Sequence, residues 1–112
     1  MLKESEFVKI VVAVPVEAAD RVRDALTKAG AGRRGNYDSC SGSYRQTGRF
    51  RPLAGARPAV GAVGKQEEIE EEVIEAICHE SLVVRAVEEI KKVHPYEEPA
   101  IDVIPRLDVS EN

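Results

Sequence analysis

The chain has 112 residues, of which 43% are hydrophobic and 32% are charged, and its formal net charge is -4. This length suits one compact domain, because domains commonly contain about 100–150 residues, and it leaves no room for a second core. The composition is typical of a folded globular protein and excludes extensive disorder. The acidic balance argues against nucleic acid as a partner, since affinity for phosphate backbones comes from clustered Lys and Arg.

Aromatic residues are limited to three Tyr and two Phe. Val, Ile, Leu and Ala must therefore build the core, and a core this small gains stability from oligomerisation. The N-terminal residues lack the pattern of a secretory signal, and their apolar run is too short to cross a bilayer. We expect a cytoplasmic protein without a membrane partner, in which Cys40 and Cys78 remain reduced thiols.

The first regular segment is a run of apolar and β-branched residues at 7–14, followed by Pro15. This pattern predicts a central strand. Over residues 16–29 the apolar positions recur every three or four residues, which predicts a helix that ends before Gly30. Its buried face would consist of Val16, Ala19, Val22, Leu26 and Ala29.

The next third of the chain, residues 32–64, is rich in Gly, Arg, Ser and Pro. Such a composition is typical of loops. Within it we expect two short extended pieces, at 37–47 and 49–53, that turn at Gly42 and Gly48.

Residues 67–79 have apolar positions at helical spacing among many Glu, so their periodicity predicts a helix. The segment 81–93 is a clearer helix, with Ser81 as its N-cap and Glu88 placed four residues before Lys92. Its apolar stripe would be Val83, Ala86, Val87 and Ile90. Two consecutive helices would leave the first strand few partners, so periodicity alone does not decide the structure of the earlier segment.

The last regular segment is a predicted strand at 100–104, with Ile101 and Val103 on one face. Pro105 ends its ladder of backbone donors. Residues 108–112 are expected to form a polar tail.

Three blocks carry a family resemblance: GNYDSC at 35–40, TGRFRPL at 47–53 and HPYEEPAIDVIPRL at 94–107. In this order and spacing they resemble the small PII-like, CutA-like domain of the YqfO family, over a core of about residues 7–107 within a single domain at 1–112. In that family the domain occurs inserted in larger proteins with a dinuclear metal centre, and also alone.

The resemblance implies an α+β fold, a ferredoxin-like βαββαβ sandwich in which two helices cover one face of an antiparallel sheet. Similar PII and CutA proteins assemble as trimers through their sheets. The resemblance also implies that residues 67–78 form a strand, against their helical periodicity. One departure is Ala59, which stands between Pro58 and Val60 where the family commonly has an aromatic residue, so a packing ring is missing.

His94 stands at the end of the second helix, with Glu97 and Glu98 within four residues. An imidazole and a carboxylate so placed are candidate ligands of a divalent metal ion, with Cys40 as a third, soft ligand. Alternatively, His94 pairs with the last carbonyls of the helix and Tyr96 fills the core. The second interpretation is favoured, because a metal site normally needs three or four ligands.

The loop at 35–38 is a candidate binding loop, because Gly and Asn permit left-handed backbone and expose N–H groups, although its Asn and Asp equally suit a capped turn. The full candidate ligand-binding set is Gly35, Asn36, Tyr37, Asp38, Arg49, Phe50, His94, Tyr96 and Glu97. A basic run surrounds this loop and consists of Arg33, Arg34, Arg45, Arg49, Arg51 and Arg57. It would either hold a phosphate or nucleotide, or form salt bridges with the Glu-rich residues 67–72 of a neighbouring subunit. The salt bridges are favoured, because no phosphate-loop motif is present.

No Ser-His-Asp or Cys-His-Asn set is recognisable in the sequence. In the larger family members the metal chemistry belongs to flanking domains. The resemblance therefore favours a non-enzymatic homotrimer that binds a small ligand, a metal ion or a protein partner at clefts between subunits, in a regulatory role. The alternatives are a CutA-like protein that binds divalent metal ions and an accessory subunit of a metal-dependent hydrolase.

Overall fold

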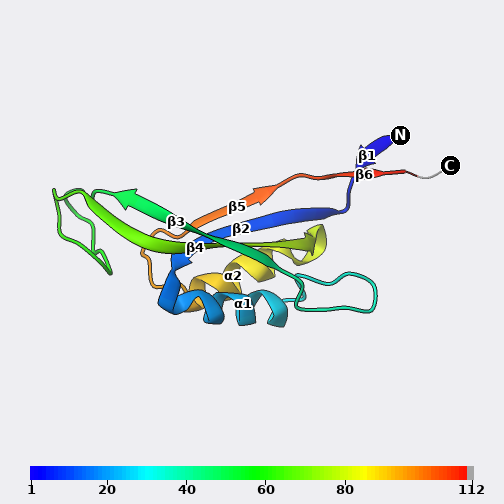
Figure 1. Cartoon of the computed structure of the whole chain (residues 1–112), viewed down its shortest axis with the longest axis horizontal. Helices are drawn as coiled ribbons and strands as arrows, with labels where there is room; N and C mark the ends of the chain where they lie inside the picture. The colour runs from blue at the N-terminus through cyan, green and yellow to red at the C-terminus, as the bar shows by residue number, and fades with distance from the viewer. Residues whose placement is uncertain (111–112) are drawn as a thin grey trace.

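The computed structural model describes residues 1–110 and has the predicted α+β fold, with two helices on one face of an antiparallel sheet (Figure 1). The four-stranded sheet has the order β3-β4-β2-β5, and β1 and β6 form a separate two-stranded ribbon. The elements are β1 (Leu2–Glu4), β2 (Phe7–Pro15), a 3-10 turn η1 (Val16–Ala18), α1 (Ala19–Lys28), β3 (Gly42–Phe50), β4 (Glu67–His79), a 3-10 turn η2 (Glu80–Leu82), α2 (Val83–Val93), β5 (Ala100–Ile104) and β6 (Leu107–Val109).

The core lies between the sheet and the two helices. Alternate residues of the central strand β2 point toward the helices, and Ile10, Val12 and Val14 are fully buried there. Val22 of α1 and Ile90 of α2 meet them from the helix side. The predicted strand at 7–14 is therefore confirmed. The predicted apolar stripes are confirmed in part, because Val16 lies in η1 and both Val16 and Val87 are only half-buried outside the core cluster.

The segment 67–79 is the strand β4, as the family resemblance implies, and the helix predicted from its periodicity is wrong. It pairs with β2 from Phe7 to Pro15 and with β3 from Gly42 to Phe50. A strand with partners on both sides satisfies its backbone hydrogen bonds throughout, which outweighs the weak helical preference of its Glu residues.

The two short pieces expected at 37–47 and 49–53 are instead one continuous strand, β3, which begins at Gly42 and runs through Gly48. No turn forms at either glycine. A Cβ on Gly48 would overlap the side chain of Glu71, so this glycine serves a close approach between strands.

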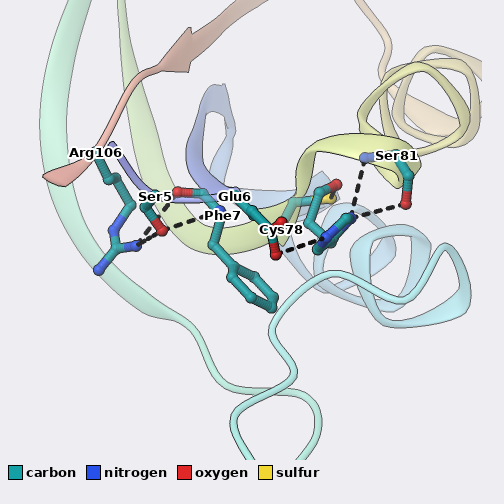
Figure 2. Close-up of polar contacts among 7 residues, drawn as sticks. Ser5, Glu6, Phe7, Cys78, Ser81 and Arg106 are labelled. Carbon is teal, nitrogen blue, oxygen red and sulfur yellow. Dashed lines mark hydrogen bonds and ion pairs between the residues drawn. The ribbon is translucent and has the colours of Figure 1, made fainter. Parts of the chain in front are cut away.

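The beginning of α2 also differs from the prediction. Ser81 lies in η2, where its backbone N–H donates to His79 Nδ1 over 3.2 Å and its hydroxyl lies 2.8 Å from the same nitrogen (Figure 2). His79 is therefore the N-cap of η2, and the N-cap residue of α2 is Leu82 and not Ser81. Further along the helix, Lys92 pairs with Glu89 at 2.9 Å, and the predicted pairing with Glu88 does not form.

The β1–β6 ribbon projects past the end of the four-stranded sheet and contributes to an elongated shape of 56 × 26 × 23 Å (Figure 1). Arg106 fixes its base, because its Nη1 donates to Ser5 Oγ and to the Phe7 carbonyl, each over 3.2 Å (Figure 2). Asp108 pairs with Lys3 inside this ribbon, so the expected polar tail begins as a strand. Residues 111–112 of that tail lie outside the described residues.

Within residues 1–110, no helix combines the length and the apolar character needed to cross a membrane. Cys40 and Cys78 are both free thiols. Cys78 is buried in the core, and burial raises the pKa of its thiol.

Candidate functional site

A groove of about 580 Å³ lies where β3 continues into the connector 51–66 and meets the segment that follows α2. Its walls are mostly apolar and include Phe50 and Pro58, while Glu71 and Tyr96 also line it. The second and third family blocks thus meet at one place in the fold. A concave, largely apolar site with a few polar groups is the usual form of a small-ligand site.

Glu71 of β4 is the central polar group of this groove and is only 6% exposed. Its Oε2 accepts a hydrogen bond of 2.7 Å from the Tyr96 hydroxyl, and its Oε1 accepts one of 3.0 Å from Gln46 Nε2. Burial raises the pKa of Tyr96, and the bond to Glu71 raises this pKa further, because the carboxylate favours the protonated phenol. Gly48 leaves room for the carboxylate beside β3.

His94 anchors the segment that carries Tyr96. Its Nε2 lies 2.8 Å from the Ala13 carbonyl, and its Nδ1 accepts a hydrogen bond of 3.1 Å from the Tyr96 backbone N–H. A carbonyl only accepts and an N–H only donates, so the ring is neutral with its proton on Nε2. Burial lowers the pKa of His94, which keeps this neutral form.

Within one chain, His94 and Glu97 of the metal prediction already have hydrogen-bond partners. Both ring nitrogens of His94 are occupied by the backbone, and Glu97 accepts a hydrogen bond of 3.1 Å from the Arg57 N–H. Among residues 1–110, no three His, Cys, Asp or Glu side chains are grouped as metal ligands would be. His94 has an architectural contact, but its partner is the Ala13 carbonyl of β2 and not the last carbonyls of the helix, and Tyr96 lines the groove instead of filling the core.

Cys40, the third ligand of that prediction, lies elsewhere. Its N–H donates to the Gly32 carbonyl, and the Gly32 N–H donates to the carbonyl of Ile77 in β4. Ile77 pairs with β2 at a position four residues before Ala13, the partner of His94. At about 3.3 Å per residue, this spacing corresponds to about 13 Å along the sheet.

The candidate ligand-binding residues divide between two places. Arg49, Phe50, Tyr96 and Glu97 line the groove, and His94 accepts a hydrogen bond from the backbone of Tyr96 without lining the groove itself. The loop 35–38 does not line the groove, and is closed by two hydrogen bonds of 2.9 Å between the backbones of Arg34 and Tyr37. Within one chain, therefore, only the later of the predicted site residues come together.

Two residues of the basic run, Arg45 and Arg49, pair with the Glu-rich run of the same chain. Arg45 lies opposite Glu72 at 3.5 Å, and Arg49 lies opposite Glu68 at 3.2 Å. These residues form a cross-strand ladder on the helix side of β3 and β4. The Glu residues with even numbers serve this ladder, whereas Glu71 points to the other face.

The sequence alone did not single out Glu71 or Gln46. Glu71 stands in a Glu-rich run that suits a solvated helix face. Once the segment is known to be a strand, the period of two separates Glu71 from Glu70 and Glu72. The alternation of side chains along a strand was therefore the sequence signal that could have distinguished Glu71 from its neighbours.

A second cavity, of about 450 Å³, lies between α1 and residues 39–41. Arg23 lines it and binds both Asp20 and Glu72, and this pairing lowers the pKa of Glu72. Cys40 also lines it. The guanidinium is occupied by its two carboxylates, so this cavity offers no free charged group at that point.

The fold defines the class of protein: two helices on an antiparallel sheet in the arrangement of CutA and PII-like proteins. CutA1 from Pyrococcus horikoshii superposes with a TM-score of 0.67 at 25% identity, over 94% of this chain and 88% of that one. A Bacillus cereus protein related to NIF3 gives a TM-score of 0.78 at 42% identity, over 95% of this chain but 26% of that one.

The curated relatives, like the Bacillus cereus protein, are longer chains that match this one over part of their length. The GTP cyclohydrolase 1 type 2 homologue of Halalkalibacterium halodurans is 45% identical over 97 residues, which are 87% of this chain and 26% of the relative. The chain thus spans about a quarter of the length of the curated relatives it matches. No family model matches the chain.

Proposed function

We propose that this chain is a non-enzymatic, PII-like domain that forms a homotrimer in the cytoplasm and binds a small ligand in a regulatory role. The groove around Glu71 and Tyr96 carries this proposal, because it is a concave site with buried polar groups. No set of nucleophile, base and orienting group lies in it. Binding, and not catalysis, is therefore the chemistry that its residues support.

The trimer is supported by the face of the sheet that lies opposite the helices. Tyr44 and Ile104 belong to this face by register, and they are 54% and 45% exposed. Large apolar side chains on an uncovered sheet are typical of an interaction surface. Because the CutA-like fold is shared, we propose that copies of the chain cover this face for one another.

Light scattering at micromolar concentration tests the assembly. We expect a mass of three times 12.3 kDa for the wild type. Ile104→Asp should lower this mass, because it places a charge on the proposed interface. Val84→Asp is the control, since Val84 is also an exposed apolar residue but lies on α2. A wild type that is monomeric at this concentration would remove the trimer from the proposal.

A second candidate function is that of an accessory subunit for a metal-dependent hydrolase. It is favoured by the curated relatives, which are about four times as long as the matched segment and are named as cyclohydrolase homologues. In that case the remaining domains would belong to another chain. Affinity capture with the full chain as bait should recover such a protein, and its repeated absence would exclude this candidate.

A further inference from the structure

Two adjacent buried carboxylates of β4 differ in how their charge is compensated. Glu72 forms ion pairs with Arg23 and Arg45 on the helix side of the sheet. Glu71 has no Lys, Arg or His partner among residues 1–110 and accepts only the neutral donors of Tyr96 and Gln46. The chain therefore supplies two cations to one carboxylate and none to its neighbour.

A buried carboxylate without a cation is costly, because neutral hydrogen bonds replace the lost water but do not cancel the charge. Glu71 is 6% exposed and lines the groove, so a cation bound in the groove would reach it. Glu97 and Glu98 add two further carboxylates to the same walls. Two guanidinium groups also line the groove: that of Arg49 is paired with Glu68, and that of Arg51 forms no ion pair or hydrogen bond with Glu71.

The groove also offers aromatic surface beside this carboxylate. The ring of Phe50 lies 6.2 Å from the ring of Tyr96, centre to centre, and both residues line the groove. The hydroxyl of Tyr96 is held by Glu71, which fixes the position of its ring. Aromatic faces attract organic cations and pack against the apolar part of such a ligand.

We propose that the groove binds an organic cation, a primary amine or guanidinium on an apolar body, whose N–H groups donate to Glu71. This inference rests on the ligand-binding function proposed above and names its ligand class. The apolar body packs against Phe50 and Tyr96. A bare metal ion does not suit the groove, because the neutral Gln46 and Tyr96 flank the one buried carboxylate.

Isothermal titration calorimetry at pH 7.5 with agmatine and phenethylamine as probes tests this ligand class. We expect saturable binding of at least one probe to the wild type. Glu71→Gln should lower the affinity by about tenfold to a hundredfold, as expected for the loss of a charged hydrogen bond. Glu70→Gln is the matched control, because Glu70 lies on the same strand but faces the other side and bonds Thr47.

A second variant keeps the test valid if Glu71→Gln does not fold, as judged by circular dichroism. Glu98 is an exposed carboxylate of the groove with no role in the core. Glu98→Gln should fold normally and lower amine affinity by about twofold to fivefold. Unchanged affinity in this folded variant and in Phe50→Ala would overturn the proposed location.

Three results would overturn the proposal: no binding of either cation, equal binding to wild type and Glu71→Gln, or tighter binding of the anion phenylpropanoate. If neither cation binds and Glu71→Gln also dissociates the oligomer, the positive charge that pairs with Glu71 would come from a neighbouring copy of the chain and not from a free ligand. Light scattering on the same samples separates the two proposals. If the chain is a monomer and binds amines, only the proposed trimer is wrong. If it is a trimer and binds phenylpropanoate in the groove, only the proposed cationic ligand is wrong.

Discussion

The hydroxyl of Tyr96 donates a 2.7 Å hydrogen bond to Glu71 Oε2 and thereby ties the segment after α2 to the middle of β4. His94, two residues earlier, ties the same segment to β2 through the Ala13 carbonyl. The position of Tyr96 in the groove therefore depends on two side-chain contacts that join the segment after α2 to the sheet. Each contact can be removed separately, which makes its contribution measurable.

Tyr96→Phe should lower the free energy of unfolding by about 1.5–3 kcal/mol, because the buried Glu71 carboxylate loses its hydroxyl donor. Urea denaturation monitored by circular dichroism measures this change. Tyr37→Phe is the control, since Tyr37 is 75% exposed and does not line the groove, and it should change stability by less than about 0.5 kcal/mol. Equal effects of the two changes would contradict the role assigned to the bond.

The stability of the wild type should fall as the pH drops below about 6.5, the ordinary pKa of His. Burial lowers the pKa of His94, so the unfolded chain takes up a proton at a higher pH than the folded chain does. The contribution of His94 is therefore complete above pH 6.5 and decreases toward the lower pKa of the folded state.

Urea midpoints between pH 7.5 and pH 5.5 measure this dependence. His94→Gln should flatten it, because Gln retains a donor for the Ala13 carbonyl but does not titrate. His79→Gln serves as the control at the other histidine, which caps η2. If His94→Gln retained the slope of the wild type, the slope would have to come from other groups.

Gly48→Ala should destabilise the fold by about 1–3 kcal/mol, because the new Cβ would overlap the carboxylate of Glu71. Gly42→Ala is the matched control on the same strand, since a Cβ there meets no atom within 4 Å. Thermal and urea unfolding of both variants measure the difference. Two variants of equal stability would mean that Glu71 moves aside at no cost.

Arg49→Ala should change stability by only about 0.2–1 kcal/mol and should leave the mass in light scattering unchanged. Its guanidinium pairs with Glu68 of the same chain, on an exposed part of the ladder. A loss of oligomer in this variant would instead support the hypothesis that the basic run binds the Glu-rich run of a neighbouring subunit.

Two residues of the groove could be predicted from sequence motifs. The blocks that contain Phe50 and Tyr96 resemble the family motifs, and the structure brings both residues to the groove. Their separation in sequence gave no indication that they meet. The metal hypothesis stays a prediction. It rests on sequence spacing, which cannot show that both nitrogens of His94 contact the backbone within the chain.

The apolar pattern of the sequence was enough to predict β2, α1, α2 and β5. β2, α1 and α2 follow their pattern because they bury an apolar run or stripe in the core, whereas only Ile101 of β5 packs against it. The apolar pattern did not predict β3 and β4, because Glu-rich and Gly-rich segments become strands by pairing with β2 and with each other. The strand at 67–78 followed from the family resemblance, and the continuous β3 was seen in the fold alone. The same pairing decided which carboxylates receive a cation. Glu72 faces Arg23 and Arg45, whereas Glu71, one residue away, faces the groove because neighbouring strand residues point to opposite sides of the sheet.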